Sequence, residues 1–404
     1  MASDSKIGSE SWRSLQRDAA PLLGSRLAES RQECTRALLS ALEQHLLRSL
    51  CDKASVIEFL RRFPDVYQSC NEEIYDRPLA AEAYAYVHLP SRYCSWWSVF
   101  TELLISGVMP MRDSGLRALD VGAGPGPASY ALIDFSEAVG RAVIGLGDHD
   151  RFRRLQTPRP DVVMVESSPA MSRLVHLLSE SRGLGGPFGA QFDDFFSLRL
   201  ARTREMNSWI RRELESKIMD EWDVGVTGAE WILREDYTGW DQPDRYQLCL
   251  ISNFLTLPRV LEQASEALRG VKRTLPAGGT IVVMGAAGQS GPYAAIYREV
   301  QRHMRGLHHL KVSGRYQPSV DDQLQESFRI FNLGIKNHIE GFGVDASEVL
   351  SAWPNILQLV EKRWRPDNRV RIPPFRIEVF RAGNQRMSRR YRRENTLAER
   401  PLRP

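Results

Sequence analysis

The stretch ALDVGAGPGPASYAL, residues 118–132, is a short apolar run that ends in an aspartate and continues into glycines at alternate positions. Glycine has no Cβ, so such a loop lets a ligand approach the main chain closely. Pro127 suits the first turn of a helix, whose N-terminal amides would face a carboxylate or phosphate. We therefore expect a strand, a ligand-binding loop and a helix. The residues expected to contact the ligand here are Asp120, Gly122, Ala123, Gly124 and Gly126.

From Leu116 onward, apolar runs that end in polar residues alternate with helical stretches, a pattern typical of βαβ units in a parallel sheet. Ligands of such sheets bind at the carboxyl ends of the strands. A charged amphipathic helix is expected within an insertion at about residues 171–228. The predicted strands are LRALDVG (116–122), DVVMVES (161–167), AEWILRED (229–236), YQLCLIS (246–252) and GTIVVMG (279–285), with FRIEVFRAG (375–383) as a last, edge strand.

Composition and length describe an ordinary globular chain: 404 residues, 42% of them apolar and 26% charged. We expect a helical N-terminal region at 1–110, an α/β domain at 111–385 and a basic, flexible tail at 386–404. The five cysteines are scattered without a CxxC pair, which indicates a reducing cytoplasm. No secretion signal, membrane-spanning run or metal site is expected.

Two further acidic positions indicate which ligand the glycine loop takes. A dinucleotide fingerprint needs glycine at position 127, where this chain has proline, so a nicotinamide cofactor is disfavoured. Glu166 ends the second run and suits the two hydroxyls of a ribose. Asp236 and Tyr237 follow the third run, where a carboxylate can accept the amino group of adenine and a ring can flank the base.

Together these residues resemble the class I S-adenosylmethionine-dependent methyltransferases over roughly residues 112–290. The resemblance implies a Rossmann-like seven-stranded sheet with helices on both faces, and S-adenosylmethionine as cofactor. It assigns the loop residues to the methionine end of the cofactor, Glu166 to the ribose and Asp236 to adenine. It also places Ser252 and Asn253 beside the transferred methyl group.

One spacing departs from this pattern. Glu166 lies 46 residues beyond Asp120, whereas about 20 residues is usual in such folds. Either residues 142–160 are an insertion, or Asp148 holds the ribose instead of Glu166.

A narrower resemblance rests on AYVHLPSRYCSWWSVFTELL (85–104), ESSPAM (166–171) and GAAGQSGPYAAIYREVQRHM (285–304). These stretches are similar to the methyltransferase-like assembly factors of the small ribosomal subunit. That family carries a cysteine-rich stretch that binds an iron–sulfur cluster. The corresponding residues here, LHHLKVSGRYQPSVDD (307–322), contain no cysteine, so no cluster is expected.

The sequence therefore predicts a methyltransferase that acts on an O or N atom of a small-molecule acceptor, in specialised metabolism for example. The candidates for a general base are His88, Tyr93 and His149, and a structural role is the alternative for each. A second interpretation is a ribosomal RNA methyltransferase-like or small-subunit assembly protein that contacts RNA through its basic tail. A third is a module that binds the cofactor without transferring its methyl group.

Overall fold

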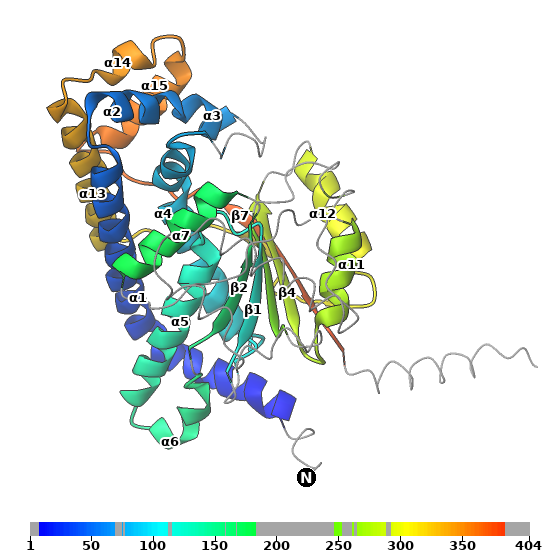
Figure 1. The fold of residues 1–404 in the computed structure, drawn as a ribbon. Coiled ribbons are helices and arrows are strands. Elements are labelled where there is room, and N and C mark those ends of the chain that lie inside the picture. Colours follow the sequence, from blue (N-terminus) through cyan, green and yellow to red (C-terminus); the bar gives the residue numbers. More distant parts are fainter. Residues whose placement is uncertain are drawn as a thin grey trace, which may run out of the picture.

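The computed structural model describes residues 8–68, 75, 77–111, 115–157, 159–166, 168–182, 246–252, 261, 265–287 and 292–383. They form the predicted α/β fold, a Rossmann-like seven-stranded sheet with helices on both faces, preceded by N-terminal helices (Figure 1). The strand order is β2-β1-β3-β4-β7-β5, and β6 also pairs with β7. The strands are β1 (Arg117–Val121), β2 (Asp161–Val165), β3 (Leu248–Ser252), β4 (Thr280–Ala286), β5 (His308–His309), β6 (Gly314–Tyr316) and β7 (Phe375–Arg381).

The first four strands are parallel, as the alternation of apolar runs and helices predicts. Successive side chains of β1 face opposite sides of the sheet. Leu119 and Val121 join the core on one face, whereas Ala118 joins the core on the other. Asp120 shares the face of Ala118, so its carboxyl lies under the helix that follows the glycine loop.

The prediction that residues 375–383 form an edge strand is wrong. β7 pairs antiparallel with β4 along its full length, and β5 and β6 pair with β7 in turn. The two additional strands are only two and three residues long. Strands this short leave no alternation in the sequence that would reveal them.

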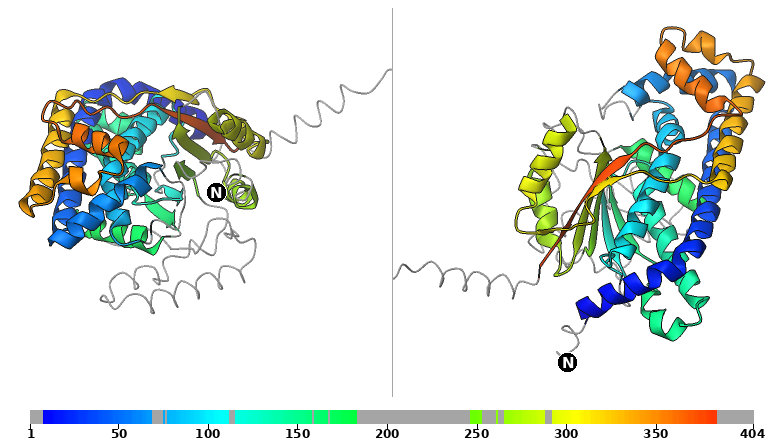
Figure 2. Two further views of the ribbon diagram at one scale, coloured as in Figure 1. Left: turned by 90° about the horizontal axis from the view of Figure 1, so that it is seen from above. Right: turned by 180° about the vertical axis from the view of Figure 1, so that it is seen from behind.

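Helices cover both faces of the sheet (Figures 1 and 2). One face carries the larger core, which the N-terminal helices share with the helices of the α/β part. The other face carries a smaller core. The larger layer contains α1 (Gly8–Ser49), α4 (Ala80–Ile105), α5 (Pro127–Ile144), α7 (Pro169–Ser181) and α13 (Asp322–Gly341), and the smaller contains α11 (Ser265–Thr274) and α12 (Pro292–His303).

Short helices lie at the two ends of the larger layer (Figure 1). α6 (His149–Phe152) and the 3-10 helix η2 (Arg153–Leu155) follow α5 and precede β2, so they account for the long spacing between Asp120 and Glu166. Four helices group at the opposite end of the layer. These are α2 (Lys53–Arg61), α3 (Phe63–Gln68), α14 (Ala346–Val349) and α15 (Pro354–Trp364).

A proline inside α4 ties this group of helices to the main layer. Pro90 has no N–H, so the carbonyl of Tyr86 loses its partner within the helix. The guanidinium of Arg363, on α15, donates to that carbonyl at 2.9 Å and to the carbonyl of Val87 at 3.2 Å. The hydrogen bond that Pro90 removes from α4 is thus replaced by one from Arg363, a residue far along the chain.

Several predicted segments fall partly or wholly outside the described residues. The expected insertion at 171–228 begins inside α7, which packs against α1 and α4. The predicted strand at 229–236 and the basic tail at 386–404 lie outside the described residues.

Candidate functional site

The glycine loop joins β1 to α5 at the carboxyl end of the sheet. Gly122, Gly124 and Gly126 adopt positive φ angles of 62°, 56° and 78°, in the left-handed region that side chains disfavour. Gly126 is also tightly enclosed, because a Cβ there would lie 3.2 Å from side-chain carbons of Met164 and Tyr130. The glycines are therefore required by the path of the main chain.

The backbone of the loop is held by β2. The amides of Gly122 and Ala123 both donate to the carbonyl of Val165, at 2.9 and 3.1 Å. Through these bonds the end of β2 fixes the start of the loop, and the residue that follows β2 lies directly beside it.

That residue is Glu166, and its two carboxylate oxygens have different donors. Oε2 accepts from the amide of Gly124 at 2.6 Å, and Oε1 accepts from the amide of Ser168 at 3.0 Å. The Ser168 side chain in turn caps the N-terminus of α7. The structure thus brings together the glycine loop and the acidic residue that the sequence assigns to one ligand.

Asp120 is fully buried beneath the loop. Its Oδ2 accepts from the hydroxyl of Ser129 at 2.7 Å. Its Oδ1 has no hydrogen-bond partner among the described residues. Burial raises the pKa of Asp120 to about 7, the nearby charge of Glu166 acts in the same direction, and the Ser129 hydrogen bonds oppose the rise.

A row of side chains from α4 lies next to the loop. A Cβ at Gly124 would lie 3.8 Å from the ring of Tyr84. The Tyr84 ring packs against His88, with 4.8 Å between ring centroids, and its hydroxyl accepts from Arg92. Tyr75 meets Tyr84 edge to face. His88 thus reaches the loop only through Tyr84.

Sequence reasoning did not identify Tyr84. A signal was present, because Tyr84 precedes the selected His88 by four residues, which places both on one face of a helix. His88 itself is mostly buried, and that burial, together with the positive charge of Arg92, lowers its pKa to about 3. Its imidazole is therefore neutral at physiological pH and is a weak base.

A second contact joins α4 to the sheet beside the site. The indole N–H of Trp96 donates to the hydroxyl of Ser252 at 3.1 Å, at the end of β3. Ser252 therefore lies at the carboxyl end of the sheet, as expected for the wall of the site. Asn253, Asp236 and Tyr237 lie outside the described residues.

The other two candidate bases lie away from the loop. Tyr93 is fully buried between helices, where its hydroxyl donates to Asp134 at 2.6 Å and Arg182 bonds the same carboxylate. Burial raises the pKa of Tyr93 well above its ordinary value, and Asp134 raises it further. This arrangement is that of a structural network.

His149 and the alternative ribose ligand Asp148 lie near the far end of α5. The helix begins at Pro127, directly after the loop, and ends at Ile144. At a rise of 1.5 Å per residue, its two ends are about 27 Å apart. The side chain of His149 bonds Gln156 at 3.0 Å. The structure therefore brings Glu166, and neither of these two residues, to the glycine loop.

None of the described helices combines the length and apolar character needed to cross a membrane. Within the same residues, no group of three or more His, Cys, Asp or Glu side chains is arranged to bind a metal ion.

Comparisons with known proteins yield distant structural likenesses. No family model matches the sequence, and no curated protein matches it. A putative sarcosine dimethylglycine methyltransferase from Galdieria sulphuraria is 13% identical, with a TM-score of 0.33 over 81% of this chain and 98% of that one. The N-methyltransferase NodS from Bradyrhizobium japonicum, solved with S-adenosylhomocysteine, is 11% identical, with a TM-score of 0.31 over 80% of this chain and all of NodS.

A third likeness is to the cyclase SpnF, 13% identical, with a TM-score of 0.34 over 73% of this chain and 82% of SpnF. At these identities and TM-scores the likenesses do not decide what the chain binds. The functional assignment depends on the residues around the glycine loop.

Proposed function

We propose that the chain is an S-adenosylmethionine-dependent methyltransferase that acts on an O or N atom of a small-molecule acceptor. One observation carries the proposal: the carboxylate of Glu166, at the end of β2, lies against the amide of Gly124 in a loop of three positive-φ glycines. This combination offers bare main chain to one part of a nucleoside ligand and a carboxylate to its sugar.

The residues present fit this cofactor. Glu166 is a carboxylate beside the loop, and a carboxylate is a group that can accept from the two hydroxyls of a ribose. The buried Oδ1 of Asp120 lacks a partner among the described residues and lies on the strand that leads into the loop. A bound cation, such as the ammonium or sulfonium of the cofactor, would favour the ionised form of Asp120.

The bound cofactor would supply an electrophilic methyl group on a sulfonium. The protein then has to align the acceptor and exclude water, with little covalent chemistry of its own. Tyr84 lies against Gly124, and Trp96 fixes the hydroxyl of Ser252 at the neighbouring strand end. Tyr84 is thus the residue of α4 expected beside the acceptor, and the buried Trp96 holds Ser252 in place from behind.

His88 is the remaining candidate for a general base, and its environment limits that role. A pKa of about 3 makes the imidazole a poor proton acceptor at neutral pH. With His88 in this state, we expect an acceptor that is already nucleophilic, such as a carboxylate or a phenolate, in preference to a neutral alcohol or a protonated amine.

The proposal is tested by calorimetry with purified protein and three compounds: S-adenosylmethionine, S-adenosylhomocysteine and NAD. We expect binding of the first two and none of the third. Glu166→Gln should weaken binding of both adenosyl compounds by about tenfold to a hundredfold, since hydrogen bonds to a charged group contribute about 1.5–3 kcal/mol. Glu340→Gln, an exposed change on α13, serves as the matched control.

Three outcomes distinguish the interpretations. Tight NAD binding without adenosyl binding would refute the proposal. Adenosyl binding without methylated product from any metabolite extract or RNA would favour a binding module. Methylated RNA, formed by wild type and not by a chain that lacks residues 386–404, would favour the RNA interpretation.

A further inference from the structure

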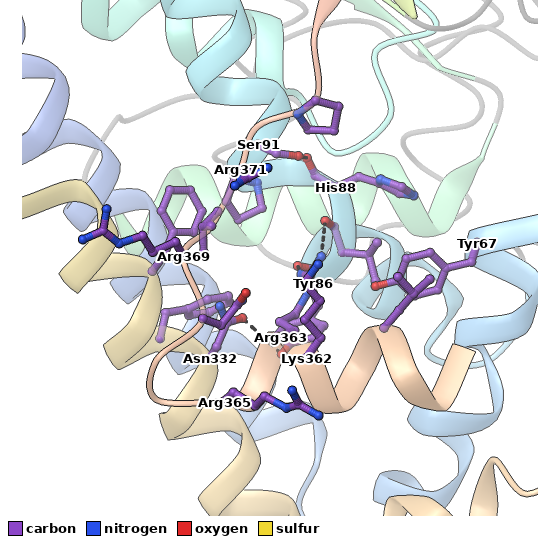
Figure 3. A pocket seen from close by; sticks show the side chains of 18 of the residues that line it. Tyr67, Tyr86, His88, Ser91, Asn332, Lys362, Arg363, Arg365, Arg369 and Arg371 are labelled. Atoms are coloured by element: carbon purple, nitrogen blue, oxygen red, sulfur yellow. Dashed lines mark hydrogen bonds between the residues drawn. The ribbon is translucent and has the colours of Figure 1, made fainter. Parts of the chain in front are cut away.

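A cavity of about 650 Å³ lies among α3, α4, α13 and α15 and the segment 365–373 that follows α15 (Figure 3). A volume of this size is typical of sites for small organic ligands. The cavity is distinct from the glycine loop, which contributes no residue to its lining.

The charge of the lining is strongly one-sided. Five cationic side chains line the cavity against one acidic side chain, Asp367. Of the cationic side chains, only Arg363 has its guanidinium hydrogen-bonded within the described part of the chain, to the carbonyls of α4. The other four have no ion pair or side-chain hydrogen bond to a described residue; they are Lys362, Arg365, Arg369 and Arg371.

The floor of the cavity is buried and polar. Tyr86 is fully buried; its hydroxyl accepts from the indole of Trp364 at 2.9 Å and donates to Asn332 Oδ1 at 3.2 Å. Asn332 is only 4% exposed, and its amide nitrogen has no hydrogen-bond partner among the described residues. This nitrogen is not one of the fully enclosed polar atoms that lack a partner, so it is open to the cavity and can donate to a ligand there.

His88 forms part of the wall of this cavity and also contacts Tyr84, which lies against Gly124. Because its imidazole is neutral, His88 adds no charge at this boundary. One histidine and one tyrosine ring thus separate the cationic cavity from the loop proposed to hold the cofactor.

We propose that this cavity binds the phosphate or carboxylate group of a small organic anion, which would be the acceptor in the proposed methyl transfer. That the bound anion is the methyl acceptor rests on the proposed function. That the cavity binds an anion rests on the cavity alone. Arginines suit such groups because they form paired, charge-assisted hydrogen bonds. A small ligand is favoured over RNA because the unpartnered donor of Asn332 belongs to the floor of the cavity and not to an exposed surface.

The test measures binding of inorganic pyrophosphate and of citrate by calorimetry at low salt, without cofactor. Wild type is compared with the double variant Arg369→Gln/Arg371→Gln, whose changes are exposed and spare the contacts of Arg363. The matched control is Arg153→Gln/Arg154→Gln, which removes the same charge from exposed positions on η2 at the other end of the layer. A further variant, Asn332→Asp, places a carboxylate at the cavity floor while keeping an acceptor for Tyr86.

We expect the Arg369/Arg371 variant to bind about tenfold more weakly or worse, and the control to bind like wild type. Asn332→Asp should also weaken binding. Preference for pyrophosphate or for citrate identifies a phosphate or a carboxylate ligand. Equal binding by wild type and the cavity variant, or no binding of either probe, would overturn the inference. A single-stranded RNA that binds wild type and not the cavity variant, while neither probe binds, would instead identify a polynucleotide surface.

Failure of this inference and failure of the proposed function are separable. The anion titrations contain no adenosyl compound, so they report on the cavity alone. If both probes bind and S-adenosylmethionine does not, the cavity is an anion site in a protein of another activity.

Discussion

Replacement of the buried Asp120 by asparagine should change how the stability of the protein depends on pH. Burial raises the pKa of this carboxyl from 3.8 to about 7 in the folded chain. The folded state therefore holds the proton more tightly than the unfolded chain does, and ionisation of Asp120 opposes folding. Below the unfolded pKa the group has no effect, between the two values stability falls as pH rises, and above about pH 7 the loss is complete.

The size of the effect follows from the shift. Each pKa unit corresponds to about 1.4 kcal/mol, so the full penalty is about 4 kcal/mol, of which about 3 kcal/mol develops between pH 5 and pH 8. Asparagine cannot ionise and lacks this penalty, although its amide would add a donor without a partner at a cost of about 1–3 kcal/mol. The cost of the unpartnered amide does not depend on pH. The change of the stability difference with pH therefore measures the ionisation penalty of Asp120 alone.

The assay is urea unfolding, followed by tryptophan fluorescence, at several values from about pH 5 to pH 8. The difference in unfolding free energy between Asp120→Asn and wild type should move in favour of the variant by about 3 kcal/mol across this range. Asp148→Asn, an exposed change, should give a profile parallel to wild type. If the Asp120→Asn profile were also parallel to wild type, the account of a carboxyl held protonated beneath the loop would be refuted.

Further predictions concern the loop and the break in α4. Gly126→Ala should destabilise the protein by about 1 kcal/mol or more and weaken binding of adenosyl compounds, because a Cβ fits neither the φ of 78° nor the enclosed space. Gly140→Ala, inside α5 with open space around it, should instead stabilise the protein by about 0.5–1 kcal/mol. If thermal unfolding showed the same change in stability for Gly126→Ala and Gly140→Ala, this explanation would be contradicted. Arg363→Ala should cost about 2 kcal/mol or more, because it removes the donors that serve the Tyr86 carbonyl. The cost should be smaller in a Pro90→Ala background, where the helix supplies its own donor, and a double-mutant cycle without such coupling would contradict this explanation.

The elements that were predicted correctly are those whose signal is local. β1, β2, β3 and β4 each coincide with a short apolar run of the sequence. The strand–loop–helix unit around the glycines was equally readable, whereas the positive φ angles of the three glycines are a finding of the structure. The pairing of Glu166 with this loop followed from the rule that carboxyl ends of parallel strands meet at one edge.

Contacts between distant segments had no local signal. The position of β7 inside the sheet depends on two very short strands, and the pairing of Arg363 with α4 joins residues 277 positions apart. The contact of Tyr84 with Gly124 likewise depends on how α4 docks on the sheet.

The sequence by itself determined the α/β class and the strand–loop–helix unit at residues 118–132, because backbone conformation and the alternation of apolar residues depend on neighbouring positions. It left the accompanying carboxylate open between Glu166 and Asp148, and the structure places Glu166 beside the loop. Only the tertiary structure decided which candidate bases reach the loop. In the packed layer, the buried Tyr93 donates a hydrogen bond to Asp134, and burial lowers the pKa of His88. The fold also places the arginines that follow α15 around one cavity. Burial and proximity arise only when segments far apart in sequence pack together, and no single segment encodes them.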